Sequence, residues 1–158
     1  MEKENINIRI IGHGLLEKEI RELTEKINPS NLELITRKLT FAELRQKMQE
    51  CQISIGQVAN HPRLTRTVPH KAFESLVMKL PYLTAREPGI LELLEENKTC
   101  ICSEPGYVDG FVDKIIYLKN HRDLLEKIAE KGFELWHREL TPKALGAKMV
   151  RDITTLKT

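Results

Sequence analysis

The stretch best suited to chemistry is a basic segment that leads into a predicted helix. Arg66 precedes Pro69, which suits the first turn of a helix, and His70, Lys71 and Glu74 follow. The open amides and positive dipole end of a helix N-terminus favour an anion, and nearby cations raise the local positive potential. Glu74 lies three and four residues after Lys71 and His70, so these side chains share a helix face.

Two interpretations of this segment are open from spacing alone. In the first, the Glu74 carboxylate accepts hydrogen bonds from both hydroxyls of a ribose, beside a phosphate bound at the turn. In the second, Lys71 and Glu74 form an ordinary surface ion pair and the other basic residues are simply solvated. The spacing favours neither.

Two other loops follow predicted strands and could also meet a ligand. Arg37 and Lys38 follow a strand near 32–36, where two cations could meet phosphate or flank a base; two solvated charges are the simpler interpretation. Residues 84–89 carry small side chains and Gly89, which would let a ligand approach the backbone. An ordinary strand-to-helix connection is the favoured interpretation of this second loop.

Several other site classes are disfavoured. Gly12-His13-Gly14 follows a strand, but Glu17 stands where a dinucleotide fingerprint needs Gly or Ala, so a tight turn is expected there. Cys100 and Cys102 lie two apart on a predicted strand, which favours buried free thiols over metal ligands. We expect no metal, and the chain has no nucleophile elbow or P-loop.

The elements that would position these residues alternate along the chain. Strands are predicted at 6–11, 32–36, 53–55, 81–84 and 99–102, and amphipathic helices follow them. Thr40 and Glu43 form a capping box that opens a helix with Phe41, Leu44 and Met48 on its inner face. This alternation predicts an α/β fold: a Rossmann-like three-layer sandwich with a mostly parallel sheet and a helical C-terminal tail. We expect a single domain over 1–158.

Composition narrows the class of protein further. Lys and Arg number 25 against 23 for Asp and Glu, so the net charge of +2 disfavours a nucleic-acid-binding surface. The charged start is unlike a signal peptide, and three cysteines fit a reducing compartment. We therefore expect a cytoplasmic protein.

Several motifs in order resemble a known family. They are IRIIGHG at 8–14, T-x-x-E-L at 40–44, CQISIG at 51–56, PHKAFESLVMKLP at 69–81 and GILELL at 89–94. Together they resemble the donor-binding C-terminal half of GT-B retaining glycosyltransferases, most of all family 4, also called glycosyl transferases group 1. The resemblance covers roughly 6–140, and the Pro-x-Lys-x-x-Glu helix followed by Leu-Pro is its most specific part.

The resemblance implies a nucleotide-sugar donor, UDP- or GDP-linked, as substrate and no cofactor. Glu74 resembles the second glutamate of the family's E-x7-E motif, which binds the donor ribose; Arg66 stands where the first would fall. Pro69, His70 and Lys71 resemble the turn at the donor phosphates. In the family, the first βα unit of the donor domain supplies an Arg/Lys pair to the diphosphate. This chain shows no such unit, and Arg66 would offset those two cations. The loop after Thr36 resembles the one that frames the base, where Arg37 and Lys38 lie.

Two parts of such an enzyme have no counterpart in the chain: the acceptor-binding domain and the first βα unit of the donor domain. Without that strand, two strand edges in the middle of the sheet would be unpaired. A truncated chain, a rearranged strand order and a strand borrowed from a second copy are all open. We expect a retaining hexosyltransferase domain, inactive as an isolated chain.

The expected partners follow from the same resemblance. They are an acceptor-binding domain or partner subunit and a second copy, and association with the inner face of a membrane would come through partners. The alternative function is a non-catalytic α/β interaction or regulatory module that keeps the scaffold; Arg66 and the absent elements favour it.

Overall fold

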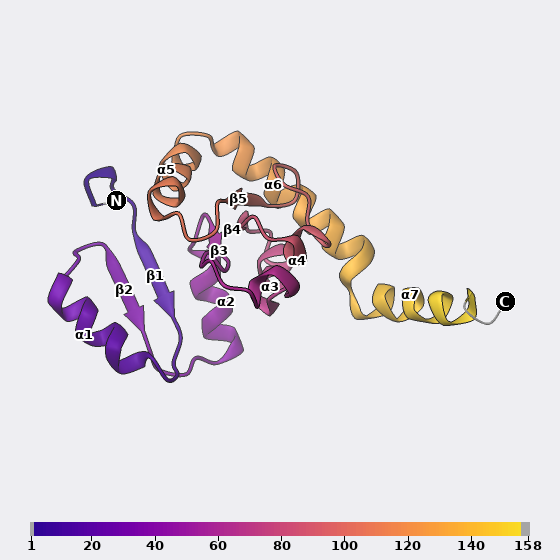
Figure 1. Cartoon of the computed structure of the whole chain (residues 1–158), viewed down its shortest axis with the longest axis horizontal. Coiled ribbons are helices and arrows are strands. Elements are labelled where there is room, and N and C mark those ends of the chain that lie inside the picture. Colours follow the sequence, from indigo (N-terminus) through magenta and orange to yellow (C-terminus); the bar gives the residue numbers. More distant parts are fainter. Residues whose placement is uncertain (1, 156–158) are drawn as a thin grey trace. The chain divides into compact units, whose positions relative to one another are not determined.

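A computed structural model describes residues 2–155 (Figure 1). The chain divides between Gln46 and Lys47 into two compact units, called here the first and the second unit. Two compact units do not decide the number of domains, so the single domain expected over 1–158 stays a prediction.

The first unit is a small parallel βαβ arrangement. It holds the 3-10 turn η1 (Glu2–Glu4), β1 (Ile8–Ile11), α1 (Glu17–Ile27), β2 (Leu32–Ile35) and most of α2 (Phe41–Gln49). β1 pairs in parallel with β2, with Ile8 opposite Leu32 and Ile11 opposite Ile35. The Thr40 side chain caps α2 as predicted: the Glu43 amide donates to Thr40 Oγ1 (3.2 Å) and the Thr40 amide donates to Glu43 Oε2 (2.8 Å).

The second unit contains a three-stranded parallel sheet in the order β3-β4-β5. Its strands are β3 (Ser54–Ile55), β4 (Tyr82–Ala85) and β5 (Ile101–Ser103). Its helices are η2 (Leu64–Arg66), α3 (His70–Val77), α4 (Pro88–Leu91), α5 (Val108–Lys119), α6 (Arg122–Leu135), the π-helix η3 (Trp136–Leu140) and α7 (Pro142–Thr155). α3 packs on β4, α6 and η3, whereas α7 extends from η3 away from the rest of this unit (Figure 1).

The main core lies between α3 and the sheet of the second unit. Its buried members are Ala72, Leu76, Tyr82, Ile90, Leu94, Cys100, Cys102 and Leu140. Ser75 Oγ donates to the Lys71 carbonyl (2.6 Å) and lies 2.7 Å from Ser54 Oγ, which fixes α3 against β3. Burial of the Tyr82 hydroxyl raises its pKa to about 12.

The structure confirms the predicted α/β, Rossmann-like class, and every described strand pairing is parallel. The strands form two separate sheets, one in each unit. One packing prediction is wrong: Phe41 is 94% exposed, whereas Leu44 and Met48 on the same face of α2 are half-buried. Phe41 is the first residue of α2, at the end of that face, where no described side chain covers it. In the part of the chain that the structure describes, no helix has both the length and the apolar character needed to span a bilayer.

Candidate functional site

The candidate site lies at the carboxyl edge of the β3-β4-β5 sheet, where three loops are tied together. The Ala85 amide and Thr84 Oγ1 both donate to the Gln57 carbonyl, at 2.8 and 3.1 Å. The Gly106 amide donates to the Val58 carbonyl (2.8 Å). The loop after β3 is therefore anchored to those after β4 and β5, at the edge where ligands bind in open α/β sheets.

The anchored loop after β3 continues through η2 and ends at the N-terminus of α3. Pro69 is the N-cap residue, with extended backbone (φ −73°, ψ 147°) and no side-chain cap. The Ala72 amide donates to the Pro69 carbonyl (3.0 Å), and no described group accepts from the amides of His70 and Lys71. Two open donors thus point out of the helix end, which is the arrangement that binds an anion.

The Glu74 side chain lies one turn further along α3 and is exposed. Among the residues that the structure describes, none forms an ion pair or hydrogen bond with its carboxylate. The expected alternative, an ion pair between Lys71 and Glu74, is absent from this described set. The carboxylate is therefore open to accept hydrogen bonds from a ligand.

The cations predicted for the site are also open. Arg66 closes η2 and is exposed, as are His70 and Lys71 in the first turn of α3. No described carboxylate pairs with Arg66 or Lys71, so their positive charge is not neutralised within the part of the chain that the structure describes. The structure brings Arg66, Pro69, His70, Lys71 and Glu74 together on one loop and helix start.

The position of η2 depends on packing that the sequence analysis did not find. Leu64 in η2 is buried, and η2 packs on α4. A Cβ atom at Gly89, in the first turn of α4, would lie 2.7 Å from the Thr67 amide nitrogen, so glycine is needed for α4 to approach this segment so closely. Within the predicted segment 84–89, Gly89 therefore supports the loop before α3. The glycine alone signalled a close approach, and spacing could not show which segment approached.

Arg86 in the same loop holds two carboxylates. Its guanidinium donates to Glu96 at 2.6 and 2.9 Å and also pairs with Glu104. The hydrogen bonds to Glu96 raise the pKa of Arg86 above its ordinary value and lower that of Glu96. Because its partners lie 10 and 18 residues away, no local pattern could have predicted this role.

Arg37 and Lys38, the predicted base-flanking pair, lie in the first unit just after β2. Arg37 donates to Glu43 Oε1 (2.7 Å), while Lys38 is exposed. The Arg37 hydrogen bond, together with those from Thr40, lowers the pKa of Glu43 to about 2. Their role at a base stays a prediction, and Arg37 already has an acidic partner.

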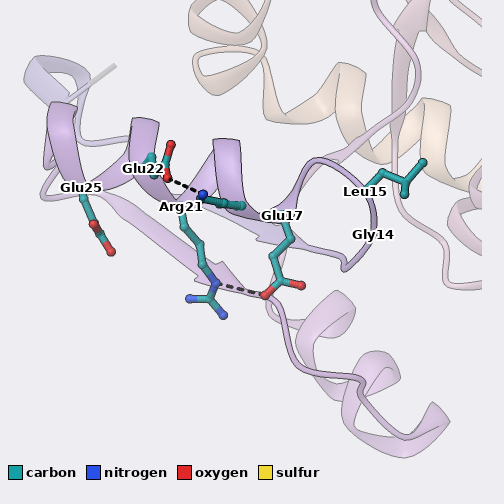
Figure 2. A pocket seen from close by; sticks show the side chains of 7 residues that line it. Gly14, Leu15, Glu17, Arg21, Glu22 and Glu25 are labelled. Atoms are coloured by element: carbon teal, nitrogen blue, oxygen red, sulfur yellow. Dashed lines mark hydrogen bonds and ion pairs between the residues drawn. The ribbon is translucent and has the colours of Figure 1, made fainter.

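The turn after β1 places Glu17 at the first position of α1, and the Glu17 amide donates to the Gly14 carbonyl (3.1 Å). A shallow pocket runs along the start of α1, beside Gly14, Glu17 and Arg21 (Figure 2). Arg21 donates to Glu17 Oε1 (3.0 Å), and this bond lowers the pKa of the Glu17 carboxyl. A negative charge therefore stands at the first turn of α1, where a dinucleotide site would place its pyrophosphate.

The cysteine pair is buried as predicted, with Cys100 Sγ and Cys102 Sγ 3.8 Å apart. Their contact and their burial raise the pKa of the Cys100 thiol. Within the described residues, no three His, Cys, Asp or Glu side chains are grouped so that they could hold a metal ion.

Solved structures define the class of fold. HepE from Anabaena, solved in complex with UDP, superposes with a TM-score of 0.77 and 15% identity over 95% of this chain and 41% of its own. The C-terminal domain of a glycosyl transferase group 1 family protein from Francisella tularensis gives a TM-score of 0.63 and 17% identity, over 80% of this chain and 63% of that one. The fold is therefore that of GT-B glycosyltransferases.

The chain belongs to the glycosyl transferase-like family, whose model matches residues 1–151. It is 26% identical to an uncharacterized glycosyltransferase from Methanocaldococcus jannaschii. The match extends over 130 residues, which are 82% of this chain and 35% of that protein. The predicted family resemblance is confirmed. The chain spans 41% of the length of HepE and 35% of that of the archaeal relative.

Proposed function

We propose that this chain is the donor-binding part of a retaining glycosyltransferase and that it binds a nucleotide-diphosphate sugar, UDP- or GDP-linked. The Anabaena relative is described in complexes with UDP and with UDP-glucose, which supports a UDP-linked donor. The nucleotide sugar is the substrate of the reaction.

One observation carries the proposal: an unpaired carboxylate lies one turn after two open helix amides. The His70 and Lys71 amides, with the Lys71 and Arg66 side chains, attract the diphosphate. The Glu74 carboxylate, which has no described partner, accepts hydrogen bonds from the ribose diol. The base-flanking role of Arg37 and Lys38, which belong to the first unit, stays a prediction from the family resemblance.

The same groups would serve the transfer reaction. When the bond between the sugar and the diphosphate breaks, negative charge builds on the departing phosphate oxygen. Amides and cations fixed at the α3 N-terminus stabilise that charge. The sugar passes to the oxygen of an acceptor hydroxyl with retained anomeric configuration, and the hydroxyl proton is taken up by the departing phosphate oxygen. An acceptor-binding domain or partner subunit binds the acceptor that carries this hydroxyl. The isolated chain therefore binds the donor but turns it over little.

Calorimetric titration with UDP, GDP and 2′-deoxy-UDP tests the proposal. We expect Glu74→Ala to weaken UDP binding roughly tenfold to a hundredfold, because it removes hydrogen bonds to a charged group. The same substitution should matter less for 2′-deoxy-UDP, which lacks one hydroxyl of the diol. Glu126→Ala, at another exposed glutamate on α6, is the matched control and should leave binding unchanged.

The second candidate function is a non-catalytic interaction or regulatory module. Arg66 favours it, because that position would carry the first glutamate of the resembled motif. If none of the nucleotides binds the wild-type chain at millimolar concentration, the donor-binding proposal is wrong and the second candidate takes its place.

A further inference from the structure

The first unit has an uncovered apolar stripe that runs along α1 and begins at its N-cap residue, Leu16. Leu16, Ile20, Leu23 and Ile27 recur at intervals of four, three and four residues and are 58, 38, 56 and 63% exposed. The side of α1 that carries Arg21 is polar, and Arg21 donates there to Thr36, the residue that follows β2. The half-buried residues of α1 are the polar Glu17 and Thr24, so the apolar stripe is not the face that its own unit covers.

The stripe has an internal symmetry. Its midpoint falls between Arg21 and Glu22, so that Leu16 mirrors Ile27 and Ile20 mirrors Leu23. If two copies of α1 pair antiparallel about a twofold axis at this point, each apolar side chain meets an apolar side chain. The 4-3-4 spacing is that of the seam positions in paired helices.

The charges beside the stripe agree with the same pairing. Glu19 and Lys26 lie seven residues apart on one flank, both are exposed, and neither has a partner among the described residues. In an antiparallel pair the same flanks of the two helices meet, so Glu19 of each copy faces Lys26 of the other. A parallel pair would place Glu19 opposite Thr24 instead, without this gain.

We propose that α1 forms a homodimer interface, in which a second copy of this chain covers the stripe in antiparallel orientation. The interface is isologous, with a paired apolar seam and two Glu19–Lys26 ion pairs between copies. It is small, so we expect dimerisation in the micromolar range.

Charge reversal provides a specific test by sedimentation velocity and light scattering. Glu19→Lys alone and Lys26→Glu alone each place like charges opposite one another and should weaken the dimer at least about tenfold. Mixing the two variants in equal amounts should restore it, because each lysine then faces a glutamate in the heterodimer. Lys18→Glu, on the opposite face of α1, is the matched control and should leave the dimer unchanged.

Two results would overturn the proposal. One is a wild-type chain that stays monomeric throughout the micromolar range, which assigns the stripe to a different occupant. The other is a dimer that survives Leu23→Asp and both charge reversals, which places its interface elsewhere. Because Leu23 is exposed, circular dichroism of Leu23→Asp should match the wild type, so a loss of dimer is not a loss of fold.

Discussion

At the scale of single residues, two glutamates show how the surroundings of a carboxylate decide what it can do. Glu43 accepts hydrogen bonds from Arg37 and from both the amide and the hydroxyl of Thr40. Glu74 occupies a similar place in the first turns of a helix, yet no described group contacts its carboxylate. The first is committed to closing a helix end, and the second is left available for a ligand.

This difference gives a pH prediction for Glu43. Its pKa in the folded chain is about 2 against an ordinary value of 4.5, so its contribution to stability is full above pH 4.5. That contribution is lost as the pH falls from 4.5 towards 2. The stability gap between the wild type and Glu43→Gln should therefore be largest near neutral pH and close in acid, as followed by thermal unfolding.

The carboxyl carbon shift of Glu43, followed by NMR, checks the same point directly. Because Arg37 makes the largest contribution, Arg37→Gln should raise the titration midpoint more than Thr40→Val does. A midpoint near 4.5 in the wild type would contradict the prediction.

At the scale of elements, β3 is held close to its neighbour by a glycine. A Cβ atom at Gly56 would lie 2.6 Å from Thr84 Oγ1 and would also contact the Tyr82 hydroxyl. Tyr82 is fully buried, so its rigid ring has no space into which to move. Gly56→Ala should therefore lower the free energy of unfolding by about 1–3 kcal/mol.

Gly146 provides the matched control for this prediction. It lies in α7, and a Cβ atom added there would have no other atom within 4 Å, so alanine meets no obstacle. Gly146→Ala should raise stability by about 0.5–1 kcal/mol, because alanine favours the helix. Urea unfolding of both variants measures the two signs, and an unchanged Gly56→Ala variant would contradict the packing argument.

The elements themselves were largely predictable, because hydrophobic periodicity and capping residues act locally. Each of the five predicted strands overlaps an observed one, and the Thr40–Glu43 box starts α2 as expected. η2 was missed, since its single turn has no periodicity; its place depends on the burial of Leu64. That Arg66 and Glu74 lie on one loop and helix start was predictable, because only seven residues separate them in the chain. The support that Gly89 gives to the loop before α3 was not predictable, because it comes from α4, which is distant in the sequence.

At the scale of the whole molecule, the core is unevenly shared between the two units. In the first unit, Thr36 is the only described residue that is buried, whereas all four residues of β4 in the second unit are buried. The sequence alternates in the same way through both, so its pattern predicted the fold class but not this asymmetry. Periodicity reports which face of an element is apolar, and it does not report whether anything covers that face.

Hydrogen exchange should reveal this asymmetry. Local stability follows buried apolar contact, so amides of β4 and β5 should exchange at least about tenfold more slowly than those of β1 and β2. Mass spectrometry of exchanged peptides measures the difference. The comparison is fair because the strand pairs of both units are hydrogen-bonded in the same parallel pattern. Equal protection would contradict the prediction, because it would mean that the first unit is as well packed as the second. Raising the protein concentration separates the causes: protection that increases in α1 and β1 alone comes from association of copies, whereas protection that is independent of concentration comes from packing within one chain.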